Sequence, residues 1–151
     1  MIEFDKEHPL EVLVVDDNRI DQKLLQIAFS KVDLPIKMTF CSSGKEALER
    51  LQSTSKENTL RPQVCFLDLS MPAVTGFDVL KAIKSNKLTQ HISVFIFSSS
   101  DREEDINRSY KNGANGYLVK PLRQEELFDL VDNLSDLWKG AYRFSETPKN
   151  L

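Results

Sequence analysis

The sequence predicts an α/β fold built on a doubly wound, five-stranded parallel sheet. Short apolar runs of strand length alternate with segments in which apolar residues recur every three or four positions, the spacing of a helix. Strands that alternate with helices form parallel sheets, because each parallel neighbour is reached through a right-handed helical crossover. We therefore expect helices on both faces of the sheet and a ligand site at the carboxyl ends of its strands.

Five segments have the length and composition of strands. The run from Ile92 to Phe97 is apolar except for Ser93 and does not alternate, which indicates a strand buried on both faces of the sheet. Ile36, Met38 and Phe40 alternate with polar residues, as in a half-buried edge strand. In chain order, the predicted strands are residues 10–15, 36–40, 64–68, 92–97 and 116–119.

Apolar residues recur at helical spacing after each of these strands. Ser100 or Asp101 is expected to cap the fourth helix, which ends at Asn112-Gly113. Such alternation defines a sheet of flavodoxin-like type. The apolar residues expected on the helix faces are Ile20, Leu24, Ile27, Ala28, Ala47, Leu48, Leu51, Phe77, Leu80, Ile83, Ile106, Tyr110, Leu127, Leu130, Val131, Leu134, Leu137 and Trp138.

The length and charge of the chain limit its organisation and its partners. A chain of 151 residues, 40% of them hydrophobic, is long enough for one domain and too short for two ordinary ones. We expect an N-terminal arm at residues 1–9, the domain at 10–139 and a tail at 140–151, with no separate output domain. The net charge of -3 argues against binding to nucleic acid or to an anionic membrane.

Neither a membrane span nor a secretion signal is visible in the sequence. The longest apolar stretches are strand-sized, and the N-terminus lacks the basic start and apolar middle of a signal peptide, so we expect a cytoplasmic protein. Cys41 and Cys65 lack metal-ligand spacing and are expected to be small buried residues rather than a redox pair. His8, in the arm, and His91, before the fourth strand, are poor candidates for chemistry.

Acidic residues follow two of the predicted strands at the point where each strand ends. The run Val12–Val15 ends on Asp16 and Asp17, and the run that begins at Val64 ends on Asp68. The carboxyl ends of parallel strands lie at one edge of the sheet, so these three carboxylates are expected to converge. Because they repel one another, the sequence predicts a pocket that binds a hard divalent cation.

Together with residues after the later strands, these acids resemble the receiver domain of two-component response regulators. The resemblance covers roughly residues 10 to 138, and its motifs are strong because they follow consecutive strands in order. The residues that carry it are Asp16, Asp17, Asp68, Met71, Pro72, Gly76, Ser98, Lys120 and Pro121. Each residue alone has an ordinary explanation, such as a helix cap or a polar loop.

The resemblance implies a phosphoryl-acceptor site. Asp68 would accept a phosphoryl group as an acyl phosphate. Magnesium, or manganese, would be held by Asp17, Asp68 and the backbone carbonyl of Ser70, with Asp16 helping directly or through water. Lys120 would supply positive charge to the phosphoryl oxygens.

Two further residues match switch positions of the family. Ser98 would provide a hydroxyl that moves to hydrogen-bond the phosphoryl group, and Tyr117 would swing inward when Ser98 moves. An ordinary amphipathic tyrosine on an edge strand explains Tyr117 equally well. The resemblance also implies a cis peptide bond before Pro121, which would aim Lys120 inward. Ser stands at position 98 where the family more often has Thr, and Ser70 stands where many relatives have Asn.

A receiver of this kind signals through proteins rather than as a conventional enzyme. The resemblance implies a histidine kinase or histidine phosphotransfer protein as donor, in a phosphorelay, and a downstream protein target. The loop from Gln52 to Pro62 and the aromatic residues of the tail look like those of single-domain regulators paired with bacterial phytochromes. Such proteins often dimerise through the face formed by the fourth helix, fifth strand and fifth helix.

Other classes of function use similar residues. A phosphatase of the haloacid dehalogenase type also needs an Asp, a hydroxyl, a Lys and magnesium, but it requires a second Asp at the position of Ser70. A flavodoxin-like electron carrier binds its flavin phosphate after the first strand, where Asp16 and Asp17 would repel it. A third alternative is a receiver-like docking module that is never phosphorylated.

Overall fold

The computed structural model describes residues 4–53, 59–120 and 123–140, and these form a parallel five-stranded sheet in the order β2-β1-β3-β4-β5. The strands are β1 (Leu10–Val15), β2 (Ile36–Cys41), β3 (Val64–Leu67), β4 (Ser93–Ser98) and β5 (Gly116–Val119). The helices are α1 (Arg19–Ser30), α2 (Gly44–Gln52), α3 (Gly76–Ser85), α4 (Glu103–Lys111) and α5 (Gln124–Lys139). The predicted doubly wound, flavodoxin-like sheet is confirmed.

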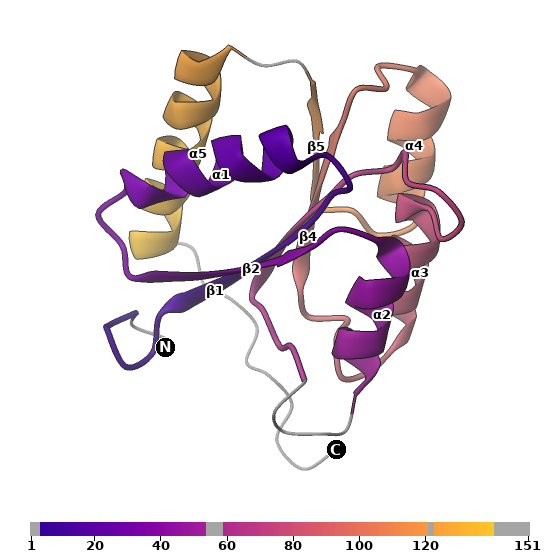
Figure 1. The fold of residues 1–151 in the computed structure, drawn as a ribbon, viewed down its shortest axis with the longest axis horizontal. Coiled ribbons are helices and arrows are strands. Elements are labelled where there is room, and N and C mark those ends of the chain that lie inside the picture. The colour runs from indigo at the N-terminus through magenta and orange to yellow at the C-terminus, as the bar shows by residue number, and fades with distance from the viewer. Residues whose placement is uncertain (1–3, 54–58, 121–122, 141–151) are drawn as a thin grey trace.

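Helices cover the sheet in two layers, with α1 and α5 on one face and α2, α3 and α4 on the other (Figure 1). Alternate residues of each central strand enter opposite layers. Val14 and Phe66 pack with the α1 and α5 side chains, whereas Val15 and Leu67 pack with those of α2 and α3. The central strands are therefore apolar on both faces, which is why they read as continuous apolar runs.

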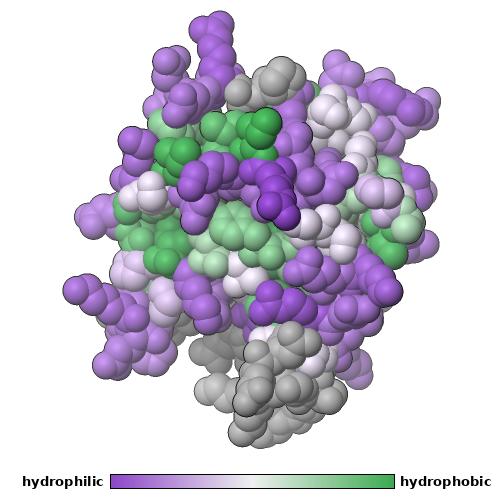
Figure 2. Space-filling model, viewed as in Figure 1, coloured by the Kyte–Doolittle hydropathy of each residue, from purple (hydrophilic) through white to green (hydrophobic). Residues whose placement is uncertain are grey.

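The edge strand β2 was predicted from its alternating pattern and lies at one end of the sheet. Its Ile36, Met38 and Phe40 are only half-buried. On the face that carries α1 and β2, apolar groups reach the surface between hydrophilic ones (Figure 2). This partial exposure follows from the edge position, because β2 has a strand neighbour on one side only.

The core between the sheet and the α1–α5 layer is organised by aromatic rings. The ring of Phe66 lies 5.6 Å from that of Phe29 on α1 and 5.7 Å from that of Phe95 on β4. The ring of Phe95 in turn lies 6.4 Å from that of Trp138 on α5. Such ring pairs add to the stabilisation from buried area, so they fix both helices against the sheet.

Side-chain caps begin three of the helices directly after the strand-end loops. Asn18 caps α1, Ser43 caps α2, and Thr75 forms a capping box with Asp78 at the start of α3. The predicted cap of α4 is wrong, because α4 begins after Arg102, which makes no side-chain capping bond.

Three helix residues assigned to apolar stripes are exposed in the structure. Ile20 is 72% exposed, Tyr110 49% and Leu137 48%. The apolar residues on these helices form a stripe wider than the buried face. The pattern therefore does not specify the rotation of each helix about its axis. Two serines, Ser109 and Ser135, lie on the buried face instead. Their hydroxyl groups donate hydrogen bonds to the backbone carbonyls of Asp105 and Val131, four residues earlier.

The two cysteines are buried and free, as expected from the sequence. They lie on opposite sides of β1, since Cys41 pairs with Val15 and Cys65 pairs with Leu13. Burial raises the pKa of Cys41 to about 11 and raises that of Cys65 further. Both thiols are therefore protonated at neutral pH and act as small core residues.

Some sequence predictions fall on residues outside the described ranges. These are the conformation at Pro121, most of the tail at 140–151 and the centre of the Gln52 to Pro62 loop. The domain boundaries at 9/10 and 139/140 also stay predictions. No helix in the described ranges is long and apolar enough to cross a membrane.

The start of α3 approaches the end of β3 very closely at Gly76. A Cβ atom at this position would lie 2.1 Å from the backbone oxygen of Asp68 and 2.6 Å from Cα of Leu69. The Gly76 N–H also donates to the carbonyl of Leu69 at 3.0 Å. Glycine is therefore required at this corner by space rather than by an unusual φ angle.

We expect Gly76→Ala to lower the free energy of unfolding by roughly 2–4 kcal/mol, because the backbone at Asp68 must shift to admit the methyl group. Denaturant unfolding measures this change. Gly140→Ala is the comparison variant, since among the described residues the atom nearest to its Cβ would be the Asp136 oxygen, at a much milder 3.3 Å. Equal stability of the two variants would contradict the close approach.

Candidate functional site

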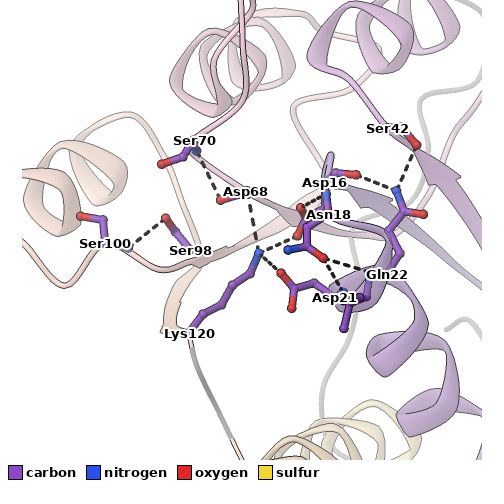
Figure 3. Close-up of polar contacts among 11 residues, drawn as sticks. Asp16, Asn18, Asp21, Gln22, Ser42, Asp68, Ser70, Ser98, Ser100 and Lys120 are labelled. Atoms are coloured by element: carbon purple, nitrogen blue, oxygen red, sulfur yellow. Dashed lines mark hydrogen bonds and ion pairs between the residues drawn. The ribbon is translucent and has the colours of Figure 1, made fainter.

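Residues that follow four strands meet at the carboxyl edge of the sheet (Figure 3). Backbone hydrogen bonds continue the sheet one residue beyond the strands: the Asp16 N–H donates to Cys41, that of Asp68 to Val15, and that of Lys120 to Ser98. The position of each side chain is thus fixed by the sheet rather than by a free loop.

The three predicted acids form one cluster. Asp16, Asp17 and Asp68 each offer a carboxylate oxygen, and these oxygens all lie within 4.8 Å of one another. Asp16 and Asp68 are buried, at 2% and 7% exposure, whereas Asp17 is exposed. Convergence of the acids, as inferred from the strand ends, is what the structure shows.

Backbone N–H groups hold the two buried carboxylates. One oxygen of Asp16 accepts from the Asn18 N–H at 2.9 Å, and one oxygen of Asp68 accepts from the Ser70 N–H at 3.3 Å. Both are turns in which an Asp bonds the backbone two residues later. The second oxygen of each carboxylate is directed to the ammonium group of Lys120.

Lys120 lies among carboxylates from three parts of the chain (Figure 3). Its Nζ is 2.7 Å from Asp16, 2.8 Å from Asp21 and 3.8 Å from Asp68. The first two distances are those of charge-assisted hydrogen bonds, and the third is longer than a hydrogen bond. The ammonium also lies 5.0 Å from the centre of the Phe97 ring, which attracts a cation.

Burial and mutual repulsion perturb the ionisation of these groups. Burial raises the pKa of Asp68 to about 6, and the charges of Asp16 and Asp17 add to this effect while Lys120 opposes it. Burial likewise raises the pKa of Asp16, against the hydrogen bonds from Lys120 and Asn18. For Lys120 burial acts to lower the pKa, but the bonds to Asp16 and Asp21 outweigh it and the pKa is raised.

The chemistry of the cluster suits a hard divalent cation. Among the described residues, one ammonium lies within 4 Å of three carboxylates, those of Asp16, Asp21 and Asp68, and Asp17 adds a fourth to the cluster, so negative charge is in excess. All the candidate ligands are oxygen atoms, the donors that Mg²⁺ and Mn²⁺ prefer. A cavity of about 430 Å³ opens beside Asp17, Asp68 and Lys120, with room for a cation and a phosphoryl group.

Ser98 is fully buried and bonded within its own loop. Its Oγ accepts from the Ser100 N–H at 3.3 Å, and among the contacts of the described residues none joins this hydroxyl to the side chain of Asp68 or Lys120. Figure 3 shows its side chain lying toward Ser100 rather than toward the ammonium. The expected contact between Ser98 and a phosphoryl group therefore needs a movement of this loop.

Tyr117 contacts the same loop. Its hydroxyl donates to the Ser100 carbonyl at 2.7 Å, so the ring end lies against the segment between β4 and α4. Ser100 does not cap α4 and instead donates to the carboxylate of Asp105 at 2.5 Å. The switch roles predicted for Ser98 and Tyr117 stay predictions, but the two residues are linked through Ser100.

Two helical residues that the sequence analysis did not select also belong to the site. Asp21 pairs with Lys120, and Gln22 donates to the backbone carbonyl of Asp16 at 2.6 Å and to Ser42 at 3.2 Å. The available signal is the Asn18 cap: it places Asp21 in the first turn of α1, beside the strand end that carries Asp16 and Asp17. An acid in a first turn is also favoured by the helix dipole.

The two histidines lie away from the cluster, as expected. His8 is exposed in the arm and paired with Asp5, and His91 precedes β4 at the opposite edge of the sheet. Burial lowers the pKa of His91, helped by the charges of Arg61 and Lys84. Neither histidine is near Asp68.

The order of elements and the acid and lysine positions at the strand ends define a receiver module, and a family model confirms this. The response regulator receiver domain model matches residues 12–132, so the chain belongs to the response regulator receiver family of two-component signalling. Receiver domains are signalling modules.

Several relatives cover nearly the whole chain. The probable methanogenesis regulatory protein FilR2 of Methanothrix harundinacea is 32% identical, over 93% of this chain and 90% of the relative. Response regulator Rcp1 of Synechocystis is 30% identical, over 86% and 89%. The resemblance to phytochrome-associated single-domain regulators is therefore confirmed.

Solved structures agree with these relatives. The Mn²⁺-bound form of Rcp1 matches with a TM-score of 0.81 and 29% identity, covering 91% of this chain and all 100% of that structure. The phosphorylated cyanobacterial phytochrome response regulator RcpA matches with a TM-score of 0.82 and 29% identity, covering 91% and 99%. Manganese binding and phosphorylation are thus seen in proteins of this fold.

The raised pKa of Asp68 has a consequence for stability in the presence of a chelator. The folded state binds the proton more tightly than the unfolded state, so stability falls as pH rises from about 4 to about 6. We expect Asp68→Asn to raise the free energy of unfolding at pH 7.5 by about 1–3 kcal/mol, and the gain to shrink below pH 6.

Denaturant unfolding over this pH range tests that expectation. Asp33→Asn removes one charge from an exposed position and is the control. A gain from Asp68→Asn that is the same at pH 4 and pH 7.5 would show that folding does not raise the pKa of Asp68.

Proposed function

We propose that Asp68 accepts a phosphoryl group in a reaction that depends on a divalent cation, and that the phosphorylated protein signals by docking to another protein. The observation that supports this most directly is the position of Asp68. It is a buried carboxylate in an acidic cluster, bordered by a cavity, with the Lys120 ammonium 3.8 Å from its free oxygen.

The proposed reaction transfers a phosphoryl group from a phosphohistidine. An oxygen of Asp68 attacks phosphorus, the bond from phosphorus to the imidazole nitrogen breaks, and its electron pair leaves with the imidazole. The product is an acyl phosphate on Asp68. The donor histidine belongs to another protein, because His8 and His91 lie away from the cluster.

Asp17, Asp68 and the Ser70 backbone carbonyl would hold Mg²⁺ or Mn²⁺, with Asp16 directly or through water. When bound, the cation neutralises repulsion between the acids and the incoming phosphoryl oxygens. Support comes from the 4.8 Å cluster of carboxylate oxygens and from the Mn²⁺-bound structure of Rcp1. Ser70 lines the same cavity as Asp17 and Asp68, which makes its backbone carbonyl a candidate ligand.

Lys120 and Ser98 would respond to the phosphoryl group. Lys120 carries a firmly held positive charge, since the bonds from Asp16 and Asp21 raise its pKa, and it supplies that charge to the phosphoryl oxygens. Ser98 would exchange the long 3.3 Å bond from Ser100 for a stronger one to an anionic oxygen. Because Tyr117 bonds the same Ser100, this exchange is carried to β5.

The partners follow from this chemistry. A histidine kinase or a histidine phosphotransfer protein supplies the phosphoryl group, and a protein target reads the change at the α4, β5 and α5 face. A homodimer formed through the same face is the arrangement we expect of a regulator similar to Rcp1 and RcpA. The cytoplasmic location expected from the sequence stays a prediction.

The haloacid dehalogenase alternative is weaker for a structural reason. Its general acid would stand two residues after the nucleophile, where this chain has Ser70, and the Ser70 backbone N–H already bonds Asp68. The alternative of a docking module that is never phosphorylated shares the fold and the acidic pocket. It differs only in lacking phosphoryl transfer, so the experiment that tests the proposal also tests this alternative.

We expect incubation with acetyl phosphate and Mg²⁺ to add one phosphoryl group, measured as intact mass. The gain should vanish with a chelator and in Asp68→Asn, which keeps the shape of the side chain but cannot form the acyl phosphate. Asp132→Asn on the exposed face of α5 is the charge control and should be phosphorylated normally. Absence of any gain in the folded wild type would favour the docking module.

Replacing Lys120 should separate metal binding from the response to phosphorylation. We expect Lys120→Ala to retain Mg²⁺ binding, because it removes a positive charge from beside the acids, but to lose most of the change at Ser98 and Tyr117. Calorimetry measures the first, and amide chemical shifts with and without phosphorylation measure the second. Loss of Mg²⁺ binding with an intact fold would contradict these roles.

A further inference from the structure

Asp21 stands apart from the other two acids that pair with Lys120. Its carboxylate lies 2.8 Å from the ammonium, as close as that of Asp16 and 1.0 Å closer than the 3.8 Å contact of Asp68. Yet it is outside the group of oxygens that could share a cation, which contains only Asp16, Asp17 and Asp68 among the described residues. The lysine thus has one close partner with no place in the metal cluster.

The position of Asp21 is set by α1 rather than by the sheet. Asn18 caps the helix and accepts the Asp21 N–H at 3.2 Å, which fixes the first turn beside the strand end of β1. The Asp21 side chain is 20% exposed, so its pairing with Lys120, itself 11% exposed, is largely shielded from water. In Figure 3 the Asp16 and Asp21 carboxylates lie on one side of the ammonium, and Asp68 lies in a different direction from it.

We propose that Asp21 is a positioning residue that holds the Lys120 ammonium away from Asp68 in the unphosphorylated protein and so leaves the Asp68 carboxylate available to the cation and to the phosphoryl donor. The inference deepens the proposed function and rests on it, because it presumes that Asp68 is a metal ligand and acceptor.

The geometry of the ammonium gives the reason. A lysine has three N–H donors, and two of them serve the short contacts to Asp16 and Asp21. An Asn at position 21 would keep an oxygen acceptor but lose the charge-assisted strength of the bond. The charged Asp68 oxygen, 3.8 Å from the ammonium, would then attract Lys120 more strongly, and a movement of about 1 Å brings it to hydrogen-bond distance. Lys120 would then neutralise the carboxylate that the cation also needs, and the two would compete.

Metal affinity tests the proposal without any phosphoryl chemistry. We expect Asp21→Asn to weaken Mn²⁺ binding, measured by isothermal titration calorimetry, by roughly three- to tenfold, a typical size for coupling between contacting residues. Asp21→Glu keeps the charge and should restore most of the affinity. Asp33→Asn makes the same change in net charge beyond the far end of α1 and should bind Mn²⁺ like the wild type.

A double-mutant cycle separates positioning from simple charge. If Asp21 acts through the ammonium, the effect of Asp21→Asn disappears in a Lys120→Met background and falls to that of Asp33→Asn. If Asp21 attracts the cation directly, the loss of affinity persists without the lysine, and the proposal is wrong.

The position of the ammonium provides a readout that does not involve metal. In a crystal structure of metal-free Asp21→Asn, we expect the distance from Lys120 Nζ to Asp68 Oδ2 to fall to about 3 Å. A distance unchanged from 3.8 Å would overturn the proposal. Asn has the shape of Asp and still occupies the first turn of α1, and thermal melting checks that the variant is folded.

The outcomes also distinguish this inference from the proposed function. Wild-type protein that does not bind Mn²⁺, or binds it as well after Asp68→Asn, would overturn both. Wild-type binding that depends on Asp68 but is unchanged by Asp21→Asn would overturn the role of Asp21 alone.

Discussion

The ammonium group of Lys120 is the interaction on which the site depends. It bonds Asp16 and Asp21 at 2.7 and 2.8 Å and faces Asp68 at 3.8 Å, so one positive charge limits the repulsion among acids from β1, α1 and β3. The lysine can reach them only because β5 places it there, with its N–H bonded to the Ser98 carbonyl at the end of β4. Sheet, first helix and last strand therefore meet in a single ion-pair network.

The negative charge of that network exceeds its positive charge, and this excess favours the binding of a cation. Burial holds the pKa of Asp68 at about 6, which means that an ionised Asp68 is costly in the folded protein without a cation. Two apolar layers around the sheet stabilise the fold enough to bear this cost. The same excess of negative charge attracts a divalent cation to the pocket. The cost to stability and the affinity for metal therefore have the same cause.

The strands and the principal acids could be predicted from the sequence because local patterns determine them. A buried parallel strand is a run of apolar residues, and a residue that ends such a run must lie at the site edge, as Asp16, Asp68 and Lys120 do. The pairing of Asp21 with Lys120 joins residues 99 positions apart and depends on the rotation of α1, which the apolar pattern left open, as the exposure of Ile20 shows. The direction of the Ser98 hydroxyl could not be predicted either, because the neighbouring serines offer alternative hydrogen-bond partners, of which Ser100 is the one observed.

The corner at Gly76 gives the pocket two unlike walls. On one side the start of α3 packs against the backbone of Asp68 with no space for a methyl group, so that side of the pocket is rigid. On the other side, within the segment from Ser98 to Arg102, the backbone N–H groups of Ser100 and Arg102 make long bonds of 3.3 and 3.4 Å, while Ser100 is also bonded to Asp105 and Tyr117 at 2.5 and 2.7 Å. In the proposed function, a disturbance at Asp68 would therefore meet a closely packed wall at α3 and more weakly bonded backbone groups after β4, on the side of α4 and Tyr117.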